Sequence, residues 1–153
     1  MSTHEQYSFF NRMYDDFIVT LMNYFPHVHR LQFYRDLCHQ FIRSDYRLPG
    51  RLFLSSVGPH SIHIFNKNDD YFLSGVEVTK SSERAVIEKT IVNEWIRMSP
   101  EQKEVVLFYL QRMLMILAEI DDDNDNDINE SVESQAGALL SNSFTQDGAL
   151  KFK

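Results

Sequence analysis

Apolar side chains recur every three or four positions along much of the first 120 residues, which is the spacing of one face of an α-helix. The first stripe predicts a helix from about Glu5 to Tyr24, ending there because Pro26 pushes the residue before it out of helical geometry. The second stripe predicts a helix from about His29 to Arg43. The first stripe consists of Phe9, Phe10, Met13, Tyr14, Phe17, Ile18 and Leu21. The second consists of Leu31, Tyr34, Leu37, Cys38, Phe41 and Ile42.

Two further helices are predicted before residue 120. One spans about Ser82 to Arg97, with apolar residues along one side. The other begins at Ser99-Pro100-Glu101-Gln102, where a capping serine, a proline at the first helical position and a glutamine at the capping-box position coincide. This last helix is expected to run to about Ile120. It is apolar over more than half its circumference, which predicts a central place in the core or in an interface.

The pattern between Arg51 and Val78 is ambiguous. Residues 51–57 fit one or two helical turns, and Pro49 is acceptable as the first residue of that helix. Gly58-Pro59 breaks or kinks the chain, residues 60–65 fit a short helix or a strand, and residues 66–70 suggest a turn. The expected fold is therefore mainly α, a compact bundle of about five helices, with a short β-hairpin near 60–78 as an open alternative.

Charge divides the chain into two parts. The net charge is −7, and residues 121–153 hold eight acidic side chains against two lysines. Acidic, Asn and Ser residues dominate directly after Ile120, and such a composition does not pack on its own. We expect a nearly neutral helical domain over 1–120 and an acidic, flexible or docking tail over 121–153.

The single cysteine, Cys38, excludes an intrachain disulfide and a cysteine-based zinc site. The N-terminal sequence lacks the basic start and apolar run of a secretory signal, and no apolar stretch is long enough for a transmembrane helix. A cytoplasmic protein in a reducing compartment is the expectation.

The acidic run resembles part of a calcium-binding loop. Its aspartates fall at the first, third, fifth and seventh positions of an EF-hand, but Asn126 replaces the glycine of the sharp turn and Val132 replaces the bidentate carboxylate. A solvated acidic linker is the favoured interpretation, with a calcium-responsive module as an alternative. The aspartates are Asp121, Asp123, Asp125 and Asp127.

No motif for catalysis is found. Cys38 lies on an apolar stripe, where a free cysteine behaves as a small buried hydrophobe. The histidine pairs His27/His29 and His60/His63 lack the additional ligands that a zinc site needs. The sequence contains no glycine-rich phosphate loop, nucleophile elbow or kinase signature. We therefore expect no enzyme activity, no catalytic residue, no bound metal and no cofactor.

A basic stripe with interleaved tyrosines lies between residues 27 and 51. Guanidinium groups suit phosphates and carboxylates alike. An acidic protein with one mildly basic stripe is a poor general binder of nucleic acid, so the expected ligand is the acidic tail or an acidic surface of another protein. The candidate interaction residues are Arg30, Arg35, Arg43, Arg47 and Arg51, together with the aromatic Trp95, Phe108 and Tyr109.

The order of motifs over residues 9–120 resembles a group of small, mostly uncharacterised helical proteins encoded by large nucleocytoplasmic DNA viruses. The resemblance implies a virion or assembly role, for instance as a minor capsid component, in the virion or the host cytoplasm. It implies capsid proteins or further copies of the chain as partners, and it carries over no catalytic residue. The motifs are Phe25-Pro26, Leu52-Phe53, His63-Ile64-Phe65, Asp69-Asp70-Tyr71-Phe72, Trp95 and Tyr109-Leu110.

The expected function is therefore that of a non-catalytic protein–protein interaction protein, as a structural or assembly component of a virion. A regulatory adaptor that uses its acidic tail as a charge mimic is the first alternative. The calcium-responsive module is the second.

Overall fold

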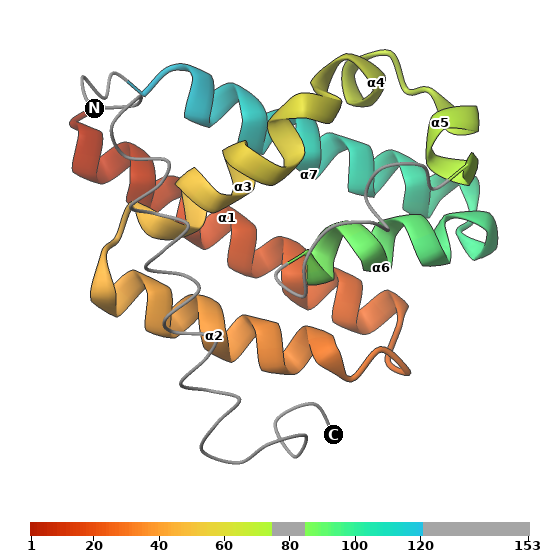
Figure 1. Cartoon of the computed structure of the whole chain (residues 1–153), viewed down its shortest axis with the longest axis horizontal. Coiled ribbons are helices and arrows are strands. Elements are labelled where there is room, and N and C mark those ends of the chain that lie inside the picture. The colour runs from red at the N-terminus through yellow and green to blue at the C-terminus, as the bar shows by residue number, and fades with distance from the viewer. Residues whose placement is uncertain (75–84, 121–153) are drawn as a thin grey trace.

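Helices account for nearly all of the part of the chain that the computed structural model describes, residues 1–74 and 85–120 (Figure 1). None of these residues forms a strand. In chain order the elements are α1 (Thr3–Tyr24), α2 (Arg30–Ser44), α3 (Leu48–Val57), the 3-10 turn η1 (Gly58–His60), α4 (Ser61–Phe65), α5 (Asp69–Ser74), α6 (Val86–Glu94), the 3-10 turn η3 (Trp95–Arg97) and α7 (Pro100–Ala118).

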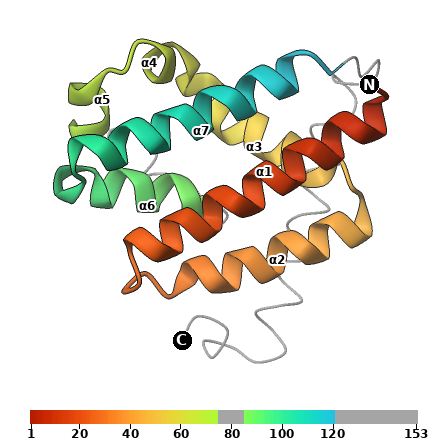
Figure 2. The same cartoon turned by 180° about the vertical axis from the view of Figure 1, so that it is seen from behind.

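Helix α1 lies between α2 and α7 in both views of the molecule (Figures 1 and 2). Helix α3 packs against α1, α2 and α7, while α6 packs against α2. The short helix α4 continues from α3 and packs on α7. The molecule is therefore a bundle in which α1 and α7 form the longest contact and the shorter helices close the remaining sides.

Aromatic rings fill the centre of the bundle. The Phe10 and Tyr14 rings of α1 lie 5.5 and 5.4 Å from the ring of Phe53 in α3. Such tilted and edge-on pairs stabilise a core beyond the area that they bury. Gly50 allows α3 to approach α7, since a Cβ atom at this position would lie 2.9 Å from the Leu117 side chain.

The capping box predicted at Ser99 is confirmed. The Gln102 backbone N–H donates to the Ser99 hydroxyl at 3.1 Å, and the Ser99 backbone N–H donates to the Gln102 side chain at 3.1 Å. An N-cap of this kind stabilises a helix by about 1 kcal/mol. The predicted helices at 5–24, 29–43 and 100–120 agree with α1, α2 and α7 to within a few residues. The helix predicted over 82–97 corresponds to α6 and η3, and residues 82–84 lie outside the described residues.

The β-hairpin alternative near 60–78 is wrong for residues 60–74, which form the end of η1 followed by α4 and α5. Two local features explain the helices. Lys67 has a φ of 52°, which turns the chain after α4. The Asn68 side chain then accepts a hydrogen bond from the Tyr71 backbone N–H at 3.2 Å, so it caps the first turn of α5. Residues 75–78 lie outside the described residues.

Candidate functional site

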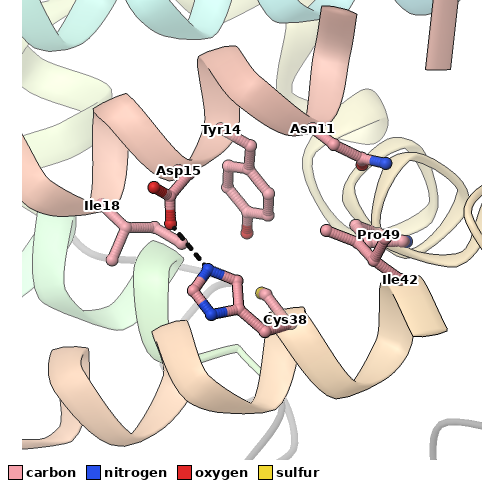
Figure 3. Close-up of a pocket in the computed structure, with 8 residues that line it drawn as sticks. Asn11, Tyr14, Asp15, Ile18, Cys38, Ile42 and Pro49 are labelled. Carbon is pink, nitrogen blue, oxygen red and sulfur yellow. Dashed lines mark hydrogen bonds and ion pairs between the residues drawn. The ribbon is translucent and has the colours of Figure 1, made fainter. Parts of the chain in front are cut away.

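A small pocket opens between α1 and α2 (Figure 3). Its volume is about 10 Å³, which is room for about one water molecule. Small-molecule sites are usually larger by more than an order of magnitude. The pocket is lined by Asn11, Tyr14, Asp15, Ile18, Cys38, His39, Ile42 and Pro49.

The charged groups at this pocket join α1 to α2. Arg35 donates to both carboxylate oxygens of Asp15, at 2.8 and 3.0 Å. The His39 ring nitrogen lies 3.1 Å from Asp15 Oδ1, as the dashed line in Figure 3 marks. The hydrogen bond from Arg35 is the main reason why the pKa of Asp15 is lowered. This two-point geometry is the stronger form of an ion pair and fixes the relative position of the helices.

We expect Asp15→Asn to lower the free energy of unfolding by about 1 kcal/mol near neutral pH, since the partly exposed pair is partly screened by solvent. Folding lowers the pKa of Asp15, so its carboxylate stabilises the fold above the unfolded pKa and loses this effect as the pH falls through the folded pKa. The difference between the two proteins should therefore shrink in acid. Urea unfolding across pH measures it.

The matched control is Asp16→Asn, at the exposed neighbouring position of α1. It should change the free energy of unfolding by less than about 0.5 kcal/mol. Equal effects of the two substitutions would contradict the proposed role of Asp15.

Cys38 is buried beside the pocket, as predicted from its place on the apolar stripe. Burial raises the pKa of its thiol, and the nearby acidic groups Asp15 and Glu88 raise it further. The reactive form of cysteine is the thiolate, which this environment disfavours. The adjacent His39 is engaged with Asp15. The arrangement therefore favours a packing role for Cys38.

Glu88 is a buried carboxyl group that the sequence analysis did not single out. It lies in the first turn of α6, and its Oε1 accepts a hydrogen bond from the Ser56 hydroxyl of α3 at 2.8 Å. Burial raises the pKa of Glu88. The hydroxyl groups of Tyr14 and Tyr34, 3.4 Å apart, belong to the same buried region. The sequence contains a signal for the burial of Glu88. This residue precedes Ile91 by three positions and Trp95 by seven, which places it on the same apolar face of the helix.

The predicted basic stripe does not form one continuous surface. Arg35 is engaged with Asp15 of α1. The Nε atom of Arg47 lies 3.0 Å from Asp45, and Arg51, with a side chain only 9% exposed, points an Nη1 atom to the same carboxylate at 3.9 Å. These hydrogen bonds and charges lower the pKa of Asp45 against the opposing effect of its partial burial.

The other two arginines of the stripe are exposed near opposite ends of α2. Arg30 and Arg43 are separated by roughly 20 Å along the helix axis. The arginine pattern therefore serves mainly to hold α1, α2 and α3 in place. The tail aspartates that it was expected to meet, Asp121, Asp123, Asp125 and Asp127, lie outside the described residues.

Trp95, an expected interaction residue, belongs to the core instead. Its side chain is buried, with the residue 1% exposed, and it stacks on Phe72 with ring centroids 4.4 Å apart. Its Nε1–H donates to Asp69 at 2.8 Å. The Lys103 ammonium group lies 5.3 Å from the ring centroid and also bonds to Asp69. The Trp95 indole therefore joins α5, η3 and α7.

Phe108 is an exposed aromatic residue on the outward side of α7. It is 55% exposed, and the Arg112 guanidinium lies 5.9 Å from its ring centroid. Met115, one further turn along the same side, is 46% exposed. Tyr109 is partly buried and packs on the Phe17 ring of α1, with the centroids 5.1 Å apart. Of the three aromatic candidates, only Phe108 is directed mainly to solvent.

The histidines His60 and His63 both contact Tyr71. The His60 ring nitrogen Nδ1 is hydrogen-bonded to the Tyr71 hydroxyl, and the His63 ring stacks on the Tyr71 ring at 3.7 Å. In residues 1–74 and 85–120, no three histidine, cysteine or acidic side chains converge as a metal site requires. Through Tyr71, His60 joins η1 to α5 and His63 joins α4 to α5.

No protein-family model, curated protein or solved structure matches the chain. Among the helices that the structure describes, none has both the length and the apolar character needed to cross a bilayer. The chemistry of this chain's own surfaces is therefore the basis for its proposed function.

Proposed function

We propose that the protein is a non-catalytic protein-binding protein whose contact surface is the outward face of α7, defined by Glu104, Phe108, Arg112 and Met115. The observation that carries the proposal is the exposure of Phe108 and Met115, at 55% and 46%, on a helix whose opposite side is already packed. Phenylalanine, methionine and arginine are the residue types enriched in protein interfaces.

The packing of α7 supports this assignment. Its inward side contacts α1, α3 and α4 through residues that are almost completely buried. The sequence predicts apolar residues over more than half of the circumference of this helix. The apolar surface of α7 is therefore larger than the part that α1, α3 and α4 cover. Exposed apolar groups that lie together on one face are typical of a contact site for another protein.

A substitution experiment on the full chain tests the proposal. Phe108→Ser combined with Met115→Ser should abolish the co-purification of the protein's partner from its native source, because the apolar contact is lost. Leu54→Ser is the control, since Leu54 is a 43% exposed apolar residue on a different helix, α3. Retention of the partner by the double variant, or equal loss with Leu54→Ser, would contradict the proposal.

A structural or assembly role in a virion stays a prediction from the resemblance, and the outward face of α7 is a surface through which such a component would attach. Counting the copies of the protein in purified particles tests that role. The charge-mimic and calcium alternatives depend on residues 121–133, which lie outside the described residues. Replacing the four aspartates of the predicted loop by asparagine in the full chain tests both, through partner binding and through the heat of calcium addition.

A further inference from the structure

The outward face of α7 carries a symmetric arrangement of charge around Phe108. Glu104 precedes Phe108 by four residues and Arg112 follows it by four, so the three side chains lie along one line of the helix. All three are exposed. Each charge lies roughly 6 Å along the axis from the aromatic ring. An acidic group and a basic group at equal distances from a central apolar residue form a self-complementary pattern.

We propose that this face binds the same face of a second copy of the chain, with the two α7 helices antiparallel and a two-fold axis passing at Phe108. This inference rests on the proposed function and names its partner. A two-fold interface uses the same residues of both copies reciprocally. Here Phe108 meets its own copy, and each Arg112 meets the Glu104 of the other chain.

The charges select this orientation over others. A parallel pairing in register would place Glu104 against Glu104 and Arg112 against Arg112. An antiparallel pairing centred between Gln111 and Arg112 would oppose Glu104 and Glu119. Like charges across an interface cost free energy, whereas the pairing centred on Phe108 joins opposite charges twice.

The existing contacts of the two charged residues are compatible with this pairing. The Lys67 ammonium group lies 3.0 Å from Glu104 Oε2, in a pair whose side chains are 51% and 64% exposed. Such an exposed pair contributes little free energy, about 0–1 kcal/mol, and the second oxygen of Glu104 can accept from a guanidinium. Arg112 already lies over the Phe108 ring, next to the proposed axis.

The contact is expected to be reversible and modest in affinity. A stable interface usually buries about 800 Å² on each partner, and one face of a single helix provides less. We therefore expect a dimer that forms as the concentration rises through roughly the micromolar to millimolar range.

Charge exchange in the full chain tests the pairing by sedimentation over a concentration series. Arg112→Glu and Glu104→Arg should each weaken the dimer by about tenfold or more, since each places like charges opposite one another. The combination of both substitutions should restore it, because the charges are then exchanged on both copies. Arg43→Glu, on the exposed side of α2, should leave the dimer unchanged.

Disulfide trapping tests the position of the axis. Phe108→Cys should cross-link two copies in oxidised glutathione, because a residue on the axis meets its own copy. Glu101→Cys lies about 10 Å from the axis and should not cross-link. The native Cys38 is buried and should not contribute.

Two outcomes would overturn the proposed pairing of α7 with a second copy of itself. One is a chain that stays monomeric throughout the concentration series. The other is a dimer that Arg112→Glu does not weaken or that the double exchange does not restore. A monomeric chain that loses a different bound protein on Phe108→Ser and Met115→Ser substitution would overturn this inference and leave the proposed function standing. If the chain stays monomeric and the double serine variant also keeps its partner, both this inference and the proposed function are contradicted.

Discussion

Replacing Trp95 by alanine is expected to lower the free energy of unfolding by about 3–5 kcal/mol, the usual effect of removing a large aromatic side chain from a core. The residue is 1% exposed, and its ring stacks on Phe72. The substitution also removes the donor that lies 2.8 Å from Asp69. Helices α5 and α7 both lose their contacts with the indole ring, so the midpoint temperature of thermal unfolding should fall as well. Urea unfolding followed by circular dichroism measures the effect.

Phe108→Ala is the matched control for this experiment. Both residues are large aromatic side chains that the sequence proposed for interaction, but Phe108 is 55% exposed. Its removal should change the free energy of unfolding by less than about 1 kcal/mol. Similar losses for the two variants would contradict the assignment of Trp95 to the core and of Phe108 to the surface.

Replacing Glu88 by glutamine is expected to stabilise the protein at neutral and alkaline pH by about 1–3 kcal/mol, the scale of an incompletely compensated buried polar group. Glutamine keeps the shape of the side chain and an oxygen that can accept from Ser56. It removes the charge that the buried site disfavours, which is the reason why the pKa of Glu88 is raised.

The raised pKa of Glu88 determines how the stability of the protein changes with pH. Because folding raises the pKa of Glu88, the folded state binds the proton more tightly than the unfolded state does. The stability that protonation provides is complete below the unfolded pKa and is lost as the pH rises through the folded pKa. Burial also raises the pKa of the neighbouring Tyr14, Tyr34 and Cys38, so these groups stay protonated in the folded protein at neutral pH.

The difference between Glu88→Gln and the parent chain should therefore be small in acid and grow as the pH rises. Chemical denaturation at a series of pH values measures it. Glu104→Gln is the control, because this exposed carboxylate should add little dependence on pH. Two results would contradict this account of Glu88. One is a Glu88→Gln variant that is less stable than the parent chain at neutral pH. The other is a difference in the free energy of unfolding that is the same at every pH.

The long helices were predictable because their information is local. The apolar stripes and the Ser99 capping box are set by residues within one or two turns of each other, and α1, α2 and α7 follow them. The interval from His60 to Ser74 was harder to predict, since its short segments satisfied both helical and extended periodicities. The Asn68 side chain decides in favour of α5 through a contact with the Tyr71 backbone.

The site residues were less predictable because their surroundings depend on tertiary contacts. The sequence shows five arginines in one interval, but only the fold places Arg35 on Asp15 and brings Arg47 and Arg51 to Asp45. Helical spacing alone did not reveal that α1 and α4 leave Phe108 uncovered. Arg112 and Met115 were missed for the same reason, although both share its helix face.

Site-specific photo-cross-linking at position 108 of the full chain, in the cell that produces it, tests the central claim most directly. A photoreactive phenylalanine analogue at Phe108 should give a discrete covalent adduct with another polypeptide, while the same group at Leu54 should give none. Mass spectrometry of the adduct then identifies the partner, including a second copy of this chain. The absence of an adduct at position 108, or equal adducts at both positions, would contradict the claim that the outward face of α7 is the contact surface.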